Sequence, residues 1–272
     1  MEFISRYIAK PPNKYGFVNY TQDEDLVWHT LYTRQIKLLH NRACDEFIQG
    51  LEILKLSQNA IPQLPDVSAK LSKATGWIVS PVAALISARN FFQLLAQRQF
   101  PAATFIRTLT ELDYIQEPDI FHELFGHCPL LTDLTYANFM QQYAAIVLSF
   151  PESEWPLLQR LFWFTVEFGL IITKSGLRAY GGGILSSINE TVYSIESDLA
   201  MRVLFNPVTV LRTPYRIDQL QKIYFVIDNY KMLYSLLTKN IAAYMQHAKE
   251  LGEYPPMFTV ERNNPNIHIL AC

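Results

Sequence analysis

Cysteine is scarce in this chain of 272 residues, with thiols only at Cys44, Cys128 and Cys272. An odd number of widely spaced cysteines does not build a disulfide framework, so we expect reduced thiols and a cytoplasmic protein. An excess of one charge is also missing. The 23 Lys and Arg against 25 Asp and Glu give a net charge of −2. That balance argues against nucleic-acid and anionic-membrane partners.

Long hydrophobic runs are absent as well. The most apolar stretch, residues 161–173, is interrupted by Glu167 and is shorter than the roughly 18 apolar residues that a membrane span needs. The first residues lack the apolar core and the cleavage site of a secretory signal. Half of the residues are hydrophobic and 18% are charged, which is typical of a soluble enzyme with a large apolar interior.

Apolar periodicity predicts a mostly α fold. We expect helices at residues 23–50, 66–75, 87–98, 118–127, 133–149, 153–174, 189–200 and 217–250. Residues 76–82 are β-prone, and residues 257–261 and 267–270 alternate around an Asn/Pro turn. The predicted organisation is an N-terminal arm at 1–14 and a single domain at 15–272, built of packed helices with a few short strands and a C-terminal β-hairpin.

The segment EPDIFHELFGHCP carries two histidines, His122 and His127, five positions apart. The H-E-x-x-H helix of zinc metalloproteases places its histidines four positions apart, on one face. On a regular helix, positions five apart diverge by roughly 140°. Both imidazoles can therefore reach one metal only if the helix ends or distorts near Gly126 and Pro129, where the sequence supplies two helix breakers.

A carboxylate ligand is available at Glu167, within the motif WFTVEFGL. Its helical neighbours three and four positions away are Trp163, Phe164, Leu170 and Ile171, all apolar. A carboxylate on such a face loses its hydration and requires a cation or a hydrogen-bond donor. Two imidazoles and one carboxylate, with open positions opposite, are typical of non-haem iron(II) oxygenases.

Three consecutive glycines, Gly181 to Gly183, follow Tyr180. No G-K-[ST] follows them and no strand with G-x-G-x-x-G precedes them, so a phosphate cradle is not predicted. A tight loop that approaches the site closely is the better interpretation.

With these residues assembled, the chain resembles the pterin-dependent aromatic amino acid hydroxylases over residues 15–270. The resemblance rests on PDIFHELFGHCPL, WFTVEFGL, AYGGGILSS and PVAALISARNFF, in the family's order and approximate spacing. It implies a mostly helical catalytic domain with Fe(II) bound by His122, His127 and Glu167. It also implies O₂ and a tetrahydropterin as co-substrates, and hydroxylation of L-phenylalanine to L-tyrosine.

The resemblance implies the binding residues too. Arg107 is expected to hold the substrate carboxylate through its guanidinium fork. The substrate residues that match are Arg107, Tyr114, Ile115, Pro118, Trp163 and Ser186. The pterin residues that match are Leu85, Ile86, Ser87, Ala88, Phe91 and Glu123. The expected supporting residues are Asp119 for Arg107, Ser186 for His122, and Glu190 beside Ser186. Without the resemblance, we would expect Phe91 to pack in the core and Arg107 to lie on the surface.

The chain departs from the family at Phe162, often Tyr, at Ile115, a Thr in animal members, and at Pro101, a His near the pterin site. Ile217 stands where tyrosine hydroxylases are expected to carry an acidic residue, which favours phenylalanine. The regulatory domain and the tetramerisation helix of animal members are missing. We therefore expect a monomer, or a homodimer paired through the C-terminal hairpin.

Other functions remain open from the sequence. A zinc hydrolase could use His122, His127 and Glu167 with Glu123 as general base, although the five-residue spacing counts against it. The substrate could be tryptophan or tyrosine instead of phenylalanine. A non-catalytic helical binding protein would keep the histidines as core residues.

Overall fold

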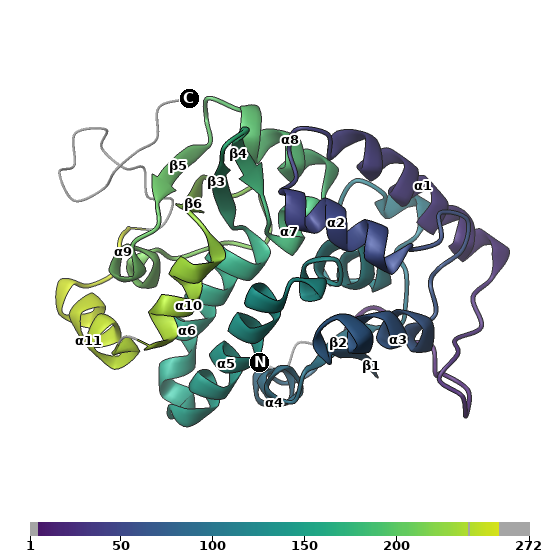
Figure 1. The fold of residues 1–272 in the computed structure, drawn as a ribbon, viewed down its shortest axis with the longest axis horizontal. Coiled ribbons are helices and arrows are strands. Elements are labelled where there is room, and N and C mark those ends of the chain that lie inside the picture. Colours follow the sequence, from purple (N-terminus) through teal and green to yellow (C-terminus); the bar gives the residue numbers. More distant parts are fainter. Residues whose placement is uncertain (1–4, 239, 256–272) are drawn as a thin grey trace.

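Helices surround two small β-sheets in the computed structural model, which describes residues 5–238 and 240–255 (Figure 1). The α-helices are α1 (Gln22–Leu38), α2 (Asp45–Leu54), α3 (Leu64–Thr75), α4 (Ala88–Ala96), α5 (Leu134–Ser149), α6 (Trp155–Phe162), α7 (Gly182–Leu185), α8 (Ile188–Glu196), α9 (Pro207–Arg212), α10 (Tyr230–Thr238) and α11 (Ile241–Leu251). The strands are β1 (Ile78–Val82), β2 (Gln99–Ala103), β3 (Leu170–Thr173), β4 (Gly176–Ala179), β5 (Met201–Leu204) and β6 (Ile223–Ile227).

The predicted mostly α fold with a few short strands is confirmed for this part of the chain. The predicted C-terminal hairpin at 257–261 and 267–270 lies outside the described residues. Among the helices of residues 5–238 and 240–255, none is both long and apolar enough to cross a membrane.

The larger sheet has the strand order β4-β3-β6-β5. Strand β3 pairs antiparallel with β4 and parallel with β6, and β5 pairs parallel with β6. The central strand β6 reads IYFVI and is buried along its whole length. The helix predicted over 217–250 is therefore wrong at its start. A short apolar run buried on both faces has no period that separates strand from helix.

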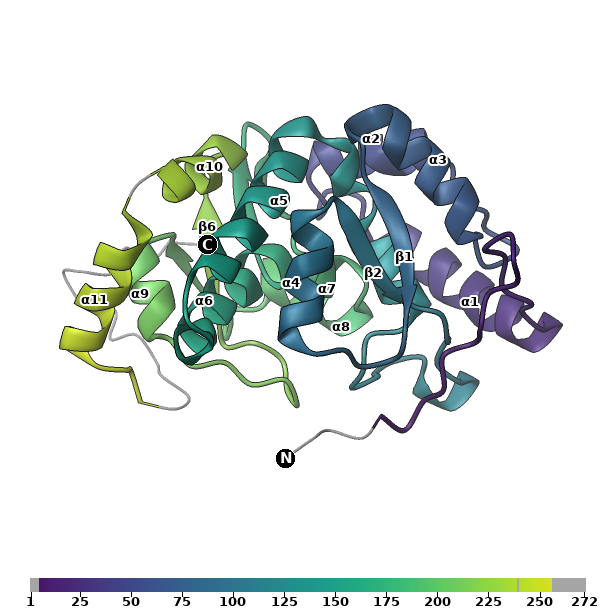
Figure 2. The same cartoon turned by 90° about the horizontal axis from the view of Figure 1, so that it is seen from below.

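The smaller sheet pairs β1 with β2 in parallel, with Ile78 opposite Gln99, and α4 connects the two strands (Figure 2). Helix α3 packs against β1 and α4 against β2. Strand β2 was not predicted from the sequence, because Pro101 lies in its middle. Proline has no N–H to donate, and a two-stranded sheet tolerates it because each strand has an unpaired edge.

The helix predicted over 153–174 ends earlier than expected. Helix α6 stops at Phe162 and a π-helical segment, η5 (Trp163–Glu167), completes it before β3 begins at Leu170. A Cβ at Gly169 would lie 2.1 Å from Cζ of Tyr180, so only glycine lets the chain pass under this ring. The turn brings β3 back against β4, and Glu167 becomes the last residue of the helical stretch.

An aromatic core anchors the segment that carries the two histidines. The rings of Phe121 and Phe125 stack with centroids 4.8 Å apart and planes 13° from parallel. Trp28 of α1 meets Phe121 edge-on at 5.3 Å, and Phe47 of α2 meets Phe125 at 6.0 Å. All four side chains are fully buried, so the segment between Phe121 and Phe125 is held by packing as well as by its own hydrogen bonds.

Candidate active site

His122 and His127 begin and end a π-helix, η2 (His122–His127). A π-helix closes its hydrogen bonds between positions five apart, so residues at that spacing lie on one face. The Nε2 atoms of the two imidazoles are 3.0 Å apart and the rings stand at 84° to each other. The distortion that the spacing requires is therefore present, and it extends over the whole segment rather than only its end at Gly126 and Pro129.

Glu167 brings a carboxylate to the same point from the second π-helical segment, η5. Its Oε1 lies 3.3 Å from Nε2 of His127 and its Oε2 lies 3.6 Å from Nε2 of His122. Two nitrogen ligands about 2.1 Å from a metal ion and at a right angle to each other are about 3.0 Å apart. The spacing of the two imidazole nitrogens matches this value, so the three side chains fit one metal ion.

A second carboxylate, that of Glu123, also has an oxygen within 4.8 Å of the histidine nitrogens. Desolvation, with the charges of Glu167 and Asp119, raises the pKa of Glu123 well above its usual value. Desolvation acts in the same direction on Glu167, but the contacts with His127 and His122 outweigh it and lower the pKa of Glu167 to about 2. The contacts with the two imidazoles therefore favour the ionised form of Glu167, whereas burial favours the protonated form of Glu123.

The protonation of His122 also suits a ligand. Desolvation lowers the pKa of His122 to about 4, so its imidazole is neutral near pH 7. Its Nδ1 lies 2.9 Å from Oγ of Ser186, whose hydroxyl donates to the carbonyl of Gly182 at 2.8 Å. A hydroxyl has one proton, so Ser186 accepts from Nδ1–H, and the lone pair of His122 is left on Nε2, facing His127 and Glu167.

Glycines allow the backbone to pack directly against the metal-binding candidates. A Cβ at Gly182 would lie 2.3 Å from Cε1 of His127, and one at Gly181 would lie 2.3 Å from the carbonyl oxygen of Glu167. The predicted close approach of this glycine run is confirmed, although Gly182 begins the short helix α7 instead of a loop. Both glycines have ordinary negative φ, so space rather than backbone conformation requires them.

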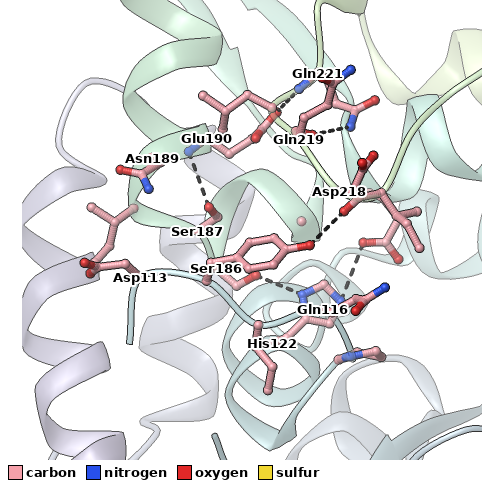
Figure 3. A pocket seen from close by; sticks show the side chains of 18 of the residues that line it. Asp113, Gln116, His122, Ser186, Ser187, Asn189, Glu190, Asp218, Gln219 and Gln221 are labelled. Atoms are coloured by element: carbon pink, nitrogen blue, oxygen red, sulfur yellow. Dashed lines mark hydrogen bonds and ion pairs between the residues drawn. The ribbon is translucent and has the colours of Figure 1, made fainter. Parts of the chain in front are cut away.

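A cavity of about 540 Å³ opens beside this group (Figure 3). It is of a size that suits a small organic ligand. The predicted residues that line it are Arg107, Tyr114, Ile115, Pro118, Trp163, Ser186, His122, Glu167 and Glu190. All six substrate candidates therefore lie around one space, together with two of the three metal-ligand candidates. His127 does not line the cavity and is buried behind it.

Arg107 forms a two-bond ion pair with Asp119. Its Nε and Nη2 atoms donate to the carboxylate at 2.7 and 2.9 Å, and its backbone N–H donates at 3.0 Å. Desolvation favours a neutral Asp119, but the charge and hydrogen bonds of Arg107 hold the pKa of Asp119 below its usual value. Asp119 also accepts from the backbone N–H of His122 at 3.0 Å, so the carboxylate connects the guanidinium to the π-helix.

An aromatic wall closes another side of the cavity. The indole of Trp163 stacks on Tyr215 with centroids 4.3 Å apart and planes 13° from parallel. Its N–H donates to Oε1 of Gln221 at 3.1 Å. Both contacts fix the orientation of the indole, so Trp163 offers a rigid flat surface to a ligand.

The pterin candidates lie elsewhere. Leu85 and Ile86 precede α4, Ser87 caps it by accepting from the N–H of Asn90, and Ala88 is its first residue. The ring of Phe91 meets Phe92 and Phe162 edge-on, each at 5.4 Å. None of the six pterin candidates, Leu85, Ile86, Ser87, Ala88, Phe91 and Glu123, lines the cavity. Their role in binding a pterin stays a prediction.

Glu190 has different partners from those expected. Its carboxylate accepts from the backbone N–H of Gln221 at 3.0 Å and from the hydroxyl of Tyr224. It therefore connects α8 to the start of β6, and its hydrogen bonds in the described structure do not include Ser186. Desolvation raises the pKa of Glu190, because the side chain is almost fully buried.

Sequence reasoning missed a large part of the lining. The missed residues are Leu112, Asp113, Gln116, Glu117, Phe168, Ser187, Ile188, Asn189, Asp218, Gln219, Leu220 and Gln221. Most of them lie in two connections, at 109–118 and 214–221, outside the long motifs, and residues 217–221 were predicted as the start of a helix. The only sequence signal was proximity to a motif: Phe168 follows Glu167, and Ser187 to Asn189 follow Ser186.

Comparison with known proteins agrees with this geometry. Residues 6–261 match the family of biopterin-dependent aromatic amino acid hydroxylases. A phenylalanine-4-hydroxylase of Pseudomonas aeruginosa is 50% identical over 254 residues, covering 93% of this chain and 97% of the relative. The solved phenylalanine hydroxylase of Legionella pneumophila is 62% identical, with a TM-score of 0.90 and coverage of 92% of this chain and 100% of that one.

A solved phenylalanine hydroxylase of Chromobacterium violaceum with bound oxidised Fe(III) is 39% identical, with a TM-score of 0.89, covering 96% of this chain and 93% of that one. The family match spans nearly the whole chain, and the relatives match in sequence and in structure over almost their full lengths. The chain belongs to the biopterin-dependent aromatic amino acid hydroxylases.

Proposed function

We propose that this enzyme is a monooxygenase that converts L-phenylalanine to L-tyrosine with Fe(II), O₂ and a tetrahydropterin. The observation that carries the proposal is the convergence of His122, His127 and Glu167 beside a cavity that also contains Arg107 and Trp163. The relatives named phenylalanine-4-hydroxylase support the choice of substrate.

Iron would be held by His122, His127 and Glu167, and together with the reduced pterin it supplies the activation of O₂. Two imidazoles and one carboxylate leave coordination positions open, as this chemistry requires. Ser186 supports the site by holding the proton of His122 on Nδ1. The contact of Gly182 with His127 supports it by limiting movement of the second ring.

The substrate would lie between a cation and an aromatic surface. Arg107, oriented by Asp119, would bind the α-carboxylate, and Trp163 would support the phenyl ring. Tyr114, Ile115 and Pro118 would cover the ligand from the rim, and Ser186 would lie beside it. Ile217 also lines the cavity, and its apolar side chain cannot accept a hydrogen bond from a ring hydroxyl, which favours phenylalanine over tyrosine.

The pterin would bind against Phe91 and the backbone of Leu85 to Ala88. Glu123 would contribute as a neutral acid, because burial and the neighbouring Glu167 raise its pKa. A protonated carboxyl group can donate one hydrogen bond to an acceptor on the pterin ring. This arrangement needs the pterin to approach from the α4 side, away from the substrate candidates.

Residues 15–272 would form the catalytic domain and residues 1–14 the arm. A cytoplasmic location is favoured by the free thiols of Cys44 and Cys128, both buried. A monomer, or a homodimer formed through the C-terminal hairpin, stays a prediction, because that hairpin lies outside the described residues.

The test is tyrosine formation by purified protein supplied with L-phenylalanine, Fe(II), O₂ and a tetrahydropterin, with each component omitted in turn. We expect tyrosine only when all are present. L-tryptophan and L-tyrosine replace L-phenylalanine in parallel reactions to test substrate preference. Absence of tyrosine from a protein that holds zinc tightly and hydrolyses esters or amides would contradict the proposal and support the hydrolase instead.

A further inference from the structure

The connection at residues 108–118, here called the rim loop, supplies consecutive lining residues from Leu112 to Pro118. Its regular structure is limited to a short 3₁₀ turn, Leu109–Glu111, which Thr108 caps. Leu109 and Tyr114 are 51% and 55% exposed. Leu112 is packed against the main core, and Ile115 against the small cluster that contains Phe105. Contacts with other parts of the chain, rather than regular structure, therefore set the position of the loop.

Two of these contacts come from residues that follow the arm in the chain. Arg34 of α1 forms an exposed ion pair with Asp113. The hydroxyl of Tyr114 donates to the carbonyl of Ile217 at 3.1 Å, and both residues line the cavity. Exposed ion pairs and single exposed hydrogen bonds contribute little, so these two contacts alone do not hold the loop firmly.

The third set of contacts comes from the N-terminal arm, at residues 5–7. The ring of Tyr7 stacks on Phe105 with centroids 4.5 Å apart and planes 6° from parallel. Its hydroxyl donates to the carboxylate of Glu111 at the start of the rim loop. Phe105 is buried, so Tyr7 is fixed to the body of the protein on one side and to the loop on the other.

The arm also holds the other end of the rim loop. The hydroxyl of Ser5 donates to Oε2 of Glu117 at 2.5 Å, and the backbone N–H of Arg6 donates to Oε1 of Glu117 at 3.1 Å. The guanidinium of Arg6 donates to Oε1 of Gln116 at 3.2 Å. Both Gln116 and Glu117 line the cavity. The arm therefore contacts both ends of the loop that carries the substrate candidates Tyr114, Ile115 and Pro118.

We propose that Ser5, Arg6 and Tyr7 are positioning residues for the amino-acid site. They fasten the rim loop so that Tyr114, Ile115 and Pro118 stay in place over the ligand, and they thereby set its affinity. This inference rests on the proposed function for the identity of the ligand. The fastening itself rests only on the contacts of the arm.

The bond between Tyr7 and Glu111 keeps its donor and acceptor over the ordinary pH range. Desolvation and the hydrogen bond to Glu111 raise the pKa of Tyr7 to about 12. Desolvation opposes ionisation of Glu111, but the bonds from Tyr7 and Thr108 together lower the pKa of Glu111 below its usual value. The contact is therefore permanent near neutral pH and not a pH switch.

The test compares Tyr7→Ala with Ile8→Ala in the full chain. Ile8 is the neighbouring residue and is 88% exposed, so its truncation controls for a change in the arm that breaks no contact with the loop. Hydrogen exchange of the peptide at 108–118 is measured without substrate. We expect exchange about tenfold faster in Tyr7→Ala and unchanged in Ile8→Ala, because exchange follows local opening.

Steady-state kinetics supply the second reading. In Tyr7→Ala we expect KM for L-phenylalanine to rise about three- to tenfold, the effect of losing one or two hydrogen-bonded contacts. We expect kcat to change less than about twofold, since the rim loop supplies substrate candidates and none of the metal-ligand candidates. Tyr7→Phe keeps the stack on Phe105 and loses only the hydroxyl, so its KM should fall between those of wild type and Tyr7→Ala.

Equal exchange and equal KM in Tyr7→Ala and Ile8→Ala would overturn the proposal. A lower kcat and a lower thermal stability in Tyr7→Ala, with KM unchanged, would also overturn it. If Tyr7→Ala does not fold, Tyr7→Phe and Ser5→Ala decide by the same two readings. Faster exchange in a protein whose wild type forms no tyrosine would uphold the fastening and reject the proposed function, so the two failures are distinguishable.

Discussion

The wall of the cavity that faces the candidate metal site and the rim loop at 108–118 differ in how their side chains are held. Ser186, on the wall, fixes the tautomer of His122, and behind the wall His127 is buried with Gly182 packed against its ring. On the rim, the holding contacts are polar, partly exposed, and reach the loop from the distant arm. A fixed wall suits metal geometry, and a rim held by separate contacts can adapt to a ligand.

The largest expected effect lies on the wall. His122→Ala removes one of the converging nitrogen donors, so we expect loss of stoichiometric iron and a fall in kcat of more than about a hundredfold, beyond what loss of an outer partner costs. Metal analysis and tyrosine formation measure it. His247→Ala is the control, because His247 is exposed and is not one of the residues that line the cavity. Iron content and activity equal to the control would show that His122 is only a core residue.

Gly182→Ala tests the close packing of the wall without removing a ligand. The new Cβ would lie 2.3 Å from the His127 ring, which must move. We expect iron affinity and activity to fall about ten- to a hundredfold, the range for a disturbed outer contact of a metal ligand. Gly183→Ala is the matched comparison, because its nearest contacts are at 3.0 Å. Equal iron affinities in the two variants would mean that the close contact between Gly182 and His127 does not hold the metal-binding candidates in place.

Arg107→Lys tests the point where the wall meets the rim loop. Lysine cannot reproduce the two parallel bonds of the guanidinium with buried Asp119, so we expect KM for L-phenylalanine to rise about tenfold. Steady-state kinetics measure the change. Arg89→Lys is the control, since Arg89 forms an exposed ion pair with Glu152. A wild-type KM in Arg107→Lys would assign the carboxylate site to another residue.

Glu190→Gln should have the smallest effect, which is a change in how the free energy of unfolding depends on pH. Burial raises the pKa of Glu190, so the folded chain binds this proton more tightly than the unfolded chain. Its contribution is therefore favourable below the unfolded pKa of about 4.3 and is lost as the pH rises through the raised folded pKa. In urea unfolding, the free energy of unfolding of Glu190→Gln should rise relative to that of wild type as the pH increases from about 4.3 through the raised pKa of Glu190.

The exposed Glu152→Gln variant is the control for this last experiment, because Glu152 is on the surface. A difference between Glu190→Gln and wild type that stays constant with pH would show that the hydrogen bonds with Gln221 and Tyr224, rather than the buried charge, set the contribution of Glu190.

Prediction of the fold succeeded where the pattern was periodic or capped. Helix α1 begins at Gln22 beside the predicted acidic start, and Asp133 caps α5 at the predicted boundary. The single helix predicted over 23–50 is wrong in its second half, because α1 ends at Leu38 and α2 begins at Asp45. It also failed at the strands β2 to β6. A strand buried on both faces such as β6, a strand with a central proline such as β2, and a strand that follows a helix directly such as β3 have no distinctive local period. Strands β4 and β5 have only four residues each, too few to show a period.

The structure brings together the candidate residues that lie inside the long motifs, and their roles in binding stay predictions. The sequence determined the donor types at His122, His127 and Glu167 and the requirement for a distorted helix, because ligand chemistry and spacing are local properties. Only the tertiary structure decided that the distortion is a π-helix, that Ser186 fixes His122, and that the arm holds the rim loop. Those contacts join residues far apart in the chain, and their geometry follows from packing that no local pattern records.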